Sequence, residues 1–289
     1  SNEWLDMVLK NYQDVTVEAY LNDESIEIER IKDTKNDKLV QIKLVFTMSA
    51  FTKCFRPVSI YPSDFSDLAV WLRADSGVTF DIPTKRVSSW LDGSAQGNNV
   101  VQATAANKPS RNGYDGQNDK AYFSFDGTND LMTSSNNSPI TTDFTIFEVS
   151  KIDSVSNSVF GWNDGAASIS IGTDASGYMS ATVGDGVTSL STNTAVVNTL
   201  SSHIGVLKKH NKRIDLEYYD SSNSIATTDN DGAFDNTFLF NTATFDIGSL
   251  NTSNFLNGQL QEVIIYDRAL STTEIANIKG YLNLKYKIY

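Results

Sequence analysis

From residue 67 to residue 270, the sequence is a series of short apolar segments separated by polar turns, with almost no helical pattern between them. Clusters of Gly, Asn, Asp, Ser and Thr, the residue types that turns favour, lie between the segments. Many short strands at roughly regular spacing predict a mainly β protein, a two-sheet antiparallel jelly-roll sandwich. We expect its strands at 68–74, 86–92, 121–126, 144–152, 158–162, 168–172, 178–184, 203–209, 213–220, 243–250 and 258–267.

The segment NGQLQEVIIYDRALSTTEIANIKGYL, residues 257–282, ends this series with a strand followed by a helix. Apolar residues fall on both faces of the strand end at 263–266, which is typical of a strand inside a sandwich. Ser271 and Glu274 match a capping box, and Ile275, Ile278 and Leu282 form one helical stripe. We expect this C-terminal helix to cover an open end of the sandwich.

Residues 1–66 have a different pattern. The spacing of Trp4, Leu5, Val8 and Leu9 predicts a short amphipathic helix. Segments 15–21, 25–31 and 38–48 alternate apolar and polar residues, which predicts a three-stranded antiparallel meander. Residues 55–64 carry two prolines and are interpreted as a joint. The chain is therefore expected to contain a small α+β docking unit at 1–66 and a β-sandwich at 67–289.

Composition excludes several classes of function. The chain has 23 Lys and Arg against 35 Asp and Glu, a net charge of -12, so we expect no nucleic-acid binding. Cys54 is the only cysteine, and His203 and His210 are the only histidines, which argues against a disulfide framework and a transition-metal site. No segment has the apolar length of a membrane span, and residues 1–14 lack the pattern of a secretory signal.

Four segments carry a resemblance to a known family: LAVWLRADSGVT (68–79), VSSWLDGSAQGNNVVQATAANKPSRN (87–112), AYFSFDGTNDLM (121–132) and FLNGQLQEVIIYDRALSTTEIANIKGYLNLKY (255–286). In this order they resemble concanavalin A-like lectin/glucanase domains, and most of all the laminin-G-like jelly roll of bacterial surface proteins and phage tail proteins. The resemblance spans about 67–289 and leaves the N-terminal part unexplained. It implies a lectin-type fold, with carbohydrate binding, glucanase activity or a bound calcium ion in different members.

Glucanase activity is not expected, because the E-x-D-x-x-E strand of the catalytic members is absent. A retaining mechanism needs two carboxylates about 5 Å apart. The nearest alternatives are the pairs Glu27 with Glu29 and Asp215 with Glu217, and both are better interpreted as solvated acidic strand faces. We therefore predict no catalytic residues and no enzyme activity.

A carbohydrate site needs an aromatic platform beside amide and carboxylate groups. Trp162, Asn163 and Asp164 fall together after a predicted strand, Asp185 lies between two glycines, and Tyr114 is another aromatic residue in a loop. These five residues are the candidate carbohydrate-binding residues. The alternative is that Trp162 packs inward at the end of its strand.

No cofactor is required by this sequence, and calcium is the one candidate. Asp229, Asp231 and Asp235 surround Gly232, and carboxylate oxygens are the ligands that calcium prefers. The position that would carry the closing Glu of an EF-hand loop is Phe240. An acidic solvent loop is the alternative interpretation of this stretch.

The function that these features favour is a non-catalytic recognition or structural module. By the resemblance, it is a phage virion protein of the tail, fibre or capsid surface, made in the host cytoplasm and binding host-surface glycans. The N-terminal unit would contact other virion proteins, and a homo-oligomer is compatible, although no repeat favours a symmetry. The alternatives are a bacterial cell-surface adhesin, a glycan hydrolase with unfamiliar carboxylates, and a structural protein without sugar affinity.

Overall fold

The chain divides into two compact units, Ser1–Ser59 and Ile60–Tyr289. The computed structural model describes residues 27–32, 39–45, 60–113, 117–197, 201–222 and 224–289. The division falls a few residues before the predicted boundary at 66/67. Residues 60–66 belong to the second unit, because the 3-10 turn η1 (Pro62–Asp64) accepts a hydrogen bond of 2.8 Å from the hydroxyl of Tyr266 at its Pro62 carbonyl.

In the first unit, β1 (Glu27–Lys32) and β2 (Leu39–Val45) pair as a two-stranded antiparallel sheet. They coincide with the predicted segments 25–31 and 38–48. The predicted helix around Trp4, the predicted strand at 15–21 and Cys54 lie outside the described residues.

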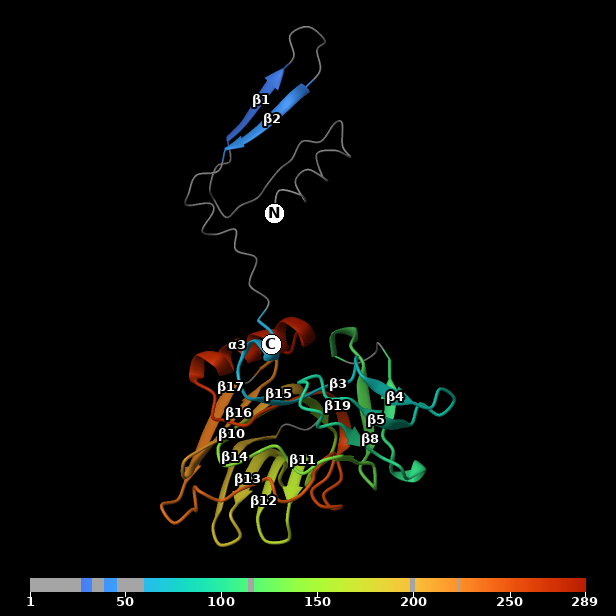
Figure 1. The fold of residues 1–289 in the computed structure, drawn as a ribbon, viewed down its shortest axis with the longest axis vertical. Helices are drawn as coiled ribbons and strands as arrows, with labels where there is room; N and C mark the ends of the chain where they lie inside the picture. The colour runs from blue at the N-terminus through green and yellow to red at the C-terminus, as the bar shows by residue number, and fades with distance from the viewer. Residues whose placement is uncertain (1–26, 33–38, 46–59, 114–116, 198–200, 223) are drawn as a thin grey trace. The chain divides into compact units, whose positions relative to one another are not determined.

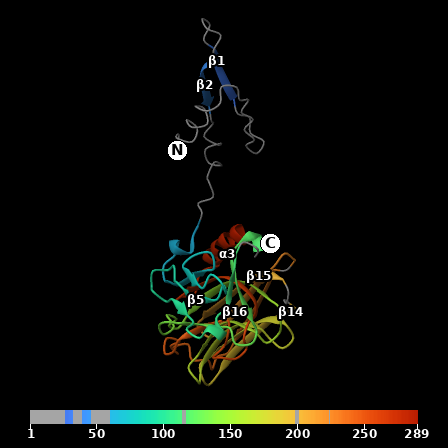
Figure 2. The ribbon, with the colours of Figure 1, turned by 90° about the vertical axis from the view of Figure 1, so that its right-hand side faces the viewer.

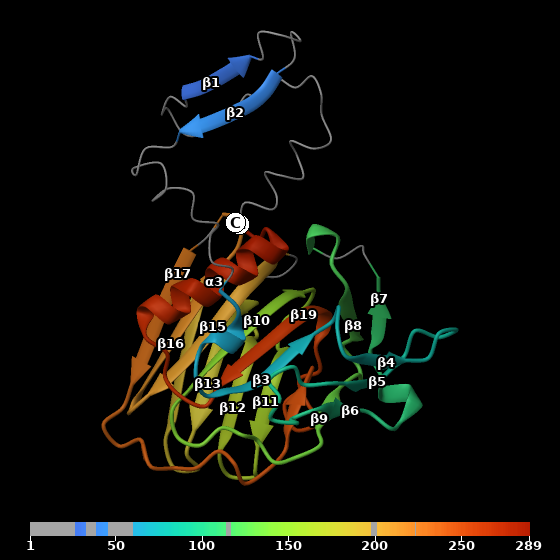
Figure 3. The ribbon, with the colours of Figure 1, turned by 45° about the horizontal axis from the view of Figure 1, so that its top comes forward.

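The first sheet of the second unit has eight strands, and β19 (Asn257–Tyr266) lies inside it. β19 pairs on one side with β10 (Phe144–Ile152) and on the other with β3 (Leu68–Arg73) and β8 (Tyr122–Asp126). The outer strands, drawn in Figure 1 and Figure 3, are β15 (Ser202–His210), β16 (Arg213–Tyr219) and β17 (Ser224–Asn230) beyond β10, and β7 (Ser110–Asn112) beyond β8. Every pair is antiparallel.

The second sheet has nine strands, all paired antiparallel. In order across the sheet they are β14 (Ser189–Val197), β13 (Tyr178–Gly184), β12 (Ser168–Thr173), β11 (Ser158–Asn163), β18 (Phe245–Ile247), β9 (Met132–Ser134), β6 (Val100–Val101), β5 (Val87–Trp90) and β4 (Val78–Phe80).

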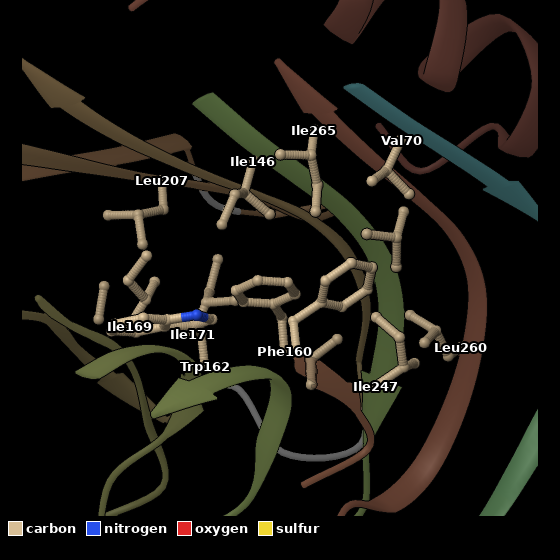
Figure 4. Close-up of a cluster of buried hydrophobic side chains, with 14 of the residues drawn as sticks. Val70, Ile146, Phe160, Trp162, Ile169, Ile171, Leu207, Ile247, Leu260 and Ile265 are labelled. Carbon is tan, nitrogen blue, oxygen red and sulfur yellow. The ribbon is translucent and has the colours of Figure 1, made fainter. Parts of the chain in front are cut away.

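The core of the second unit lies between these two sheets. Alternating residues of the longer inner strands point inward and are buried, because successive side chains of a strand lie on opposite faces. Figure 4 shows Ile146, Leu207 and Ile265 of the eight-stranded sheet facing Phe160, Trp162 and Ile171 of the nine-stranded sheet. The predicted two-sheet antiparallel sandwich is therefore confirmed.

The short strands β4, β6, β7 and β9 and the longer strands β14 and β17 are absent from the predicted set. More than half of the residues of β14 and β17 are polar, which obscures the apolar alternation. No residue of β17 is buried, and its inner neighbour β16 supplies its backbone hydrogen bonds. The two strands lie at corresponding edges of the two sheets, where the amide of Ser191 donates a 2.8 Å hydrogen bond to Asp229 Oδ2. Edge strands of this kind are held by pairing rather than by burial.

Helix α3 (Thr272–Tyr286) begins after Ser271, as predicted, but it does not pack against the predicted surface, an open end of the sandwich. Ser271 and Glu274 form the capping box. The apolar stripe of Ile275, Ile278 and Leu282 packs on Phe147 and other residues of the outward face of the eight-stranded sheet, so α3 covers that face and not an open end of the sandwich (Figure 3). No helix among the described residues has the length and apolarity to cross a membrane.

A buried carboxylate holds the C-terminal half of α3 against the sheet. Glu262 of β19 is fully buried and accepts hydrogen bonds from the indole of Trp71 (2.7 Å) and from the hydroxyls of Tyr281 (3.0 Å) and Tyr286 (2.7 Å). Lys285 donates to the same carboxylate at 2.8 Å. A buried charge is tolerated only when it is paired and hydrogen-bonded in this way.

Candidate functional site

The candidate carbohydrate residues that the structure describes lie at one end of the sandwich. Asn163 and Asp164 begin the turn between β11 and β12, and Asp185 begins the turn between β13 and β14. A side chain added at Gly186 would touch Ala166, so the two turns are neighbours. In Figure 1 and Figure 2 these turns and α3 lie at opposite ends of the second unit. Tyr114 lies outside the described residues.

Trp162 is not part of an exposed platform. Its side chain is 1% exposed, and its ring packs edge-on against Phe240 and Phe238. The indole N–H donates a 3.1 Å hydrogen bond to the carbonyl of Ala243. Figure 4 shows the ring inside the core. The predicted role in stacking on a sugar is therefore wrong, because the inward face of β11 is the one that carries Trp162.

Asn163 and Asp164 use their side chains to close the turn that follows β11. Asn163 Oδ1 accepts from the amide of Gly165, and Asp164 Oδ1 accepts from the amides of Ala166 and Ala167 at 3.0 and 2.8 Å. Burial opposes the ionised form of Asp164, but these hydrogen bonds outweigh it and hold its pKa below the usual value. Asp164 itself remains exposed.

Asp185 joins its own turn to the loop at 231–243. Its Oδ1 accepts from the amides of Val187 and Thr188, and its Oδ2 accepts from the amide of Asp235 at 2.6 Å. Burial opposes ionisation here as well, and the hydrogen bonds from Thr188, Asp235 and Val187 lower its pKa. Asp185 is therefore a structural anion, with both oxygens occupied by backbone donors.

The three candidate calcium ligands do not converge on one point. Asp229 accepts from the amide of Ser191, Asp231 from the amide of Ala233, and Asp235 from the amide and hydroxyl of Thr237. Within the part of the chain that the structure describes, no group of three His, Cys, Asp or Glu side chains is placed to hold a metal ion. Asp231 and Asp235 close turns, and Asp229 joins β17 to β14.

The two acids of β16 with glucanase-like spacing are each paired with cations. Asp215 contacts Arg213 at 2.7 Å and His210 at 3.0 Å, whereas Glu217 contacts Lys279 of α3 at 2.7 Å. Burial opposes ionisation of Asp215, and hydrogen bonds from Arg213, Thr228 and His210 lower its pKa. A general acid needs a raised pKa, so Asp215 is unsuited to that role.

Buried Glu148, Ser150 and His203 form a second group of reactive side-chain types. They lie on the inward faces of β10 and β15, and each is at most 1% exposed. A catalytic or binding residue must reach its substrate, and these three side chains are enclosed between the sheets. They therefore serve the stability of the sandwich.

A surface not predicted from the sequence lies on the outward face of β12, β13 and β14. Strand register brings together a patch of nine small uncharged residues, which we name the hydroxyl face: Ser168, Ser170, Gly172, Ser180, Thr182, Gly184, Ser189, Ser191 and Asn193. Thr182 and Ser191 share a hydrogen bond of 3.0 Å across two strands. The signal in the sequence is the alternation of small polar residues with buried apolar ones, repeated in three segments.

Two loops lie at the border of the hydroxyl face, where each contacts the backbone of a glycine: the loop at Asn157 contacts Gly172, and the loop at Ser249 contacts Gly161. A side chain at Gly172 would collide with the carbonyl of Asn157, and one at Gly161 of β11 would collide with the carbonyl of Ser249. Thr182, Ser170, Gly161 and Asp246 lie opposite one another across β13, β12, β11 and β18. In this row of paired residues, Asp246 is the charged residue nearest to the hydroxyl face. Burial raises the pKa of Asp246, while hydrogen bonds from Thr133 and Ser249 oppose the rise.

No protein-family model matches the chain, and no curated protein matches it. Among solved structures, the chain is similar to the binding domain of Paraclostridial Mosquitocidal Protein 1, with a TM-score of 0.54 and 15% identity over 77% of this chain and 54% of that chain. It is similar to domain 4 of a GH43 extracellular arabinanase from Geobacillus stearothermophilus in complex with arabinotriose, with a TM-score of 0.52 and 12% identity over 73% of this chain and 98% of that domain. The chain is also similar to a sialidase of Trypanosoma rangeli, with a TM-score of 0.52 and 15% identity over 76% of this chain and 33% of the sialidase chain. These likenesses support the two-sheet β-sandwich fold.

Proposed function

We propose that the second unit is a non-catalytic carbohydrate-recognition module. The observation that carries this proposal is the match to the arabinanase domain, which was solved with arabinotriose bound and of which 98% is covered. Because the match takes in nearly the whole of a separate domain, the likeness concerns a complete module and not a fragment of a larger enzyme. The identity of 12% leaves the site on this chain to be argued from its own surface.

The hydroxyl face is the surface that we assign to the sugar. Its Ser, Thr and Asn side chains donate and accept hydrogen bonds, as sugar hydroxyls do. The absence of long side chains lets a saccharide approach the sheet closely. Since this patch carries no aromatic residue, recognition would rest on hydrogen bonds instead of ring stacking, and we expect modest affinity.

The pairing of the strand acids supports a non-catalytic role. Asp215 pairs with Arg213 on its own strand, and Glu217 pairs with Lys279 of α3. Hydrolysis of a glycosidic bond by the retaining or inverting route requires two cooperating carboxyl groups. Incubation with polysaccharides that releases no new reducing ends is the expected result.

We further propose that this chain is a virion protein, made in the host cytoplasm, whose first unit contacts other virion proteins. This part rests on the resemblance of residues 67–289 to the laminin-G-like domains of phage tail proteins. Antibody labelling of purified particles, viewed by electron microscopy, tests it. Label on cell surfaces and none on particles would favour the adhesin alternative.

The carbohydrate proposal is tested by a glycan array, run with and without EDTA, on the full chain and two variants. Thr182→Glu places a long charged side chain at the centre of the hydroxyl face. Thr79→Glu is the matched control, because Thr79 lies in the same row of the sheet at its far edge, on β4.

We expect Thr182→Glu to weaken binding at least about tenfold, a change of about 1.4 kcal/mol, and Thr79→Glu to leave it unchanged. EDTA is expected to have no effect. A blank array for the wild-type chain would refute sugar recognition. Equal loss in both variants would move the site away from the hydroxyl face.

A further inference from the structure

The hairpin between β15 and β16 is the densest cationic stretch of an acidic chain. Residues 208–213 read KKHNKR, so four of the 23 Lys and Arg residues and one of two histidines fall within six positions. The chain as a whole carries a net charge of -12. A local concentration of positive charge against this background marks a surface for an anion.

Strand register places most of these cations on one surface. Lys208 lies opposite Asp215, and His210 lies opposite Arg213. Since directly opposed residues of an antiparallel pair share a face, all four side chains lie on the outward face of the eight-stranded sheet. We name Lys208, His210 and Arg213, with Asp215 between them, the basic patch. Lys209 points inward, is fully buried and pairs with Asp143 at 3.1 Å.

Asp215 orders the basic patch without neutralising it. Its carboxylate lies 2.7 Å from Arg213, 3.0 Å from His210 and 3.6 Å from Lys208. One negative charge therefore faces two permanent positive charges and an imidazole. Arg213 is 47% exposed and His210 is 32% exposed, so both reach solvent while Asp215 fixes their position. Side chains that are held before binding lose less conformational entropy when a ligand arrives.

The surroundings of the basic patch are polar. On β17, Thr228 lies opposite Asp215 and Asn230 lies opposite Arg213, which adds a hydroxyl and an amide beside the cations. Helix α3 covers the neighbouring row of the same face, where Lys279 pairs with Glu217. Among the described residues of β15, β16 and β17, no large apolar side chain is exposed, so nothing is available for insertion into a lipid surface.

We infer that the basic patch binds the carboxylate of an acidic saccharide, such as a uronic acid. This inference rests on the proposed carbohydrate recognition. It adds a ligand class, the acidic saccharides, and a second binding subsite besides the hydroxyl face. Guanidinium and ammonium groups form charge-assisted hydrogen bonds with a carboxylate. Thr228 and Asn230 then supply hydrogen bonds to the hydroxyls of the ring, a combination that suits a sugar acid.

The test is calorimetric titration of the full chain with trigalacturonic acid and with its methyl ester. The two ligands share every sugar hydroxyl and differ only at the carboxyl groups, which are charged in the acid and are neutral methyl esters in its counterpart. The variant Lys208→Gln/Arg213→Gln removes the two permanent charges. Lys85→Gln/Lys287→Gln is the matched control, since both of these lysines are exposed and lie outside the patch.

We expect the wild-type chain to bind the acid roughly five- to tenfold more tightly than the ester, and the preference to shrink as salt is added. The patch variant should bind both ligands equally, and the control variant should keep the preference. Equal thermal midpoints of the three proteins would confirm that the substitutions leave the fold intact.

Other outcomes separate the two proposals. If neutral sugars bind on the glycan array but the acid is not preferred to its ester, the basic patch inference fails and the carbohydrate proposal stands. If no sugar binds, both fail. If poly-glutamate binds as tightly as trigalacturonic acid, or if the control variant also loses the preference, the assignment of a saccharide to the basic patch is overturned.

Discussion

Glu148 and His203 form an ion pair inside the sandwich, with 3.1 Å between Oε1 and Nε2 and neither side chain exposed to solvent. They come from the neighbouring strands β10 and β15 and point into the space between the two sheets. Gly205, directly opposite Glu148, leaves room for the carboxylate, because a side chain there would collide with it. His203 also contacts Ser150 Oγ at 3.2 Å and the carbonyl of Ser201 at 3.1 Å.

Replacing His203 with Leu should destabilise the protein by about 3–5 kcal/mol, because it leaves the carboxylate of Glu148 buried without its counter-ion. Urea unfolding, followed by circular dichroism, measures the change in the free energy of unfolding. The double variant Glu148→Leu/His203→Leu is the control, and it should lose much less than the single variant. A larger loss in the double variant would show that the two side chains stabilise the core independently.

The same pair should make stability depend on pH. Burial opposes the charged imidazole, but the carboxylate charge of Glu148, 3.1 Å away, outweighs it and raises the pKa of His203 above 6.5. The folded state thus holds the proton more tightly than the unfolded chain, so this contribution is complete below pH 6.5 and is lost as the pH rises through the folded-state pKa. Unfolding curves across this range should show the decline in the wild-type chain, and Glu148→Gln/His203→Gln should lack it.

Removing the carboxylate of Glu262 should release α3 from the sheet. Glu262→Ala leaves Trp71, Tyr281, Tyr286 and Lys285 without their common partner, and we expect a loss of about 3–5 kcal/mol. Hydrogen exchange should show faster exchange of the amides of α3. Lys279→Ala, on the same helix but in a more exposed ion pair, should cost about 1 kcal/mol or less. Equal effects of the two substitutions would contradict the central role of Glu262.

Trp162 should matter for stability and not for sugar binding. Trp162→Ala removes a fully buried ring and should cost about 3–5 kcal/mol. Trp162→Phe keeps most of the packing, and we expect it to fold and to bind glycans as the wild-type chain does. If Trp162→Phe folds but no longer binds glycans on the array, the prediction is contradicted and Trp162 contacts the ligand.

The strands rich in apolar residues could be predicted because apolar and polar residues alternate along them. The bounds of β10 and β13 are those expected, and each carries buried side chains on its inward face. β14 and β17 could not be predicted, because their place depends on neighbouring strands and on the contact between Ser191 and Asp229. The position of α3 was also beyond the sequence pattern, since an apolar stripe does not specify which surface it will cover.

The candidate site was predicted less well than the fold. Asp164, Asp185 and Asp235 were chosen for their oxygens, and the structure uses those oxygens to close turns and join loops. The hydroxyl face could not be predicted, because its residues are spread over three segments and become neighbours only through strand register. Acid-rich turns are thus a weak predictor of a ligand site, since Asp is favoured in turns for its own hydrogen bonds.

The pairing of β3 with β19 has a consequence for biosynthesis. β3 is the first strand of the second unit and β19 is its last, yet they are adjacent in the sheet. During translation, β3 and the free side of β10 must therefore wait for β19 to leave the ribosome before either can complete its hydrogen bonds. Contacts so distant in sequence slow folding. Until β19 pairs, the exposed strand edges of such a chain are prone to aggregation.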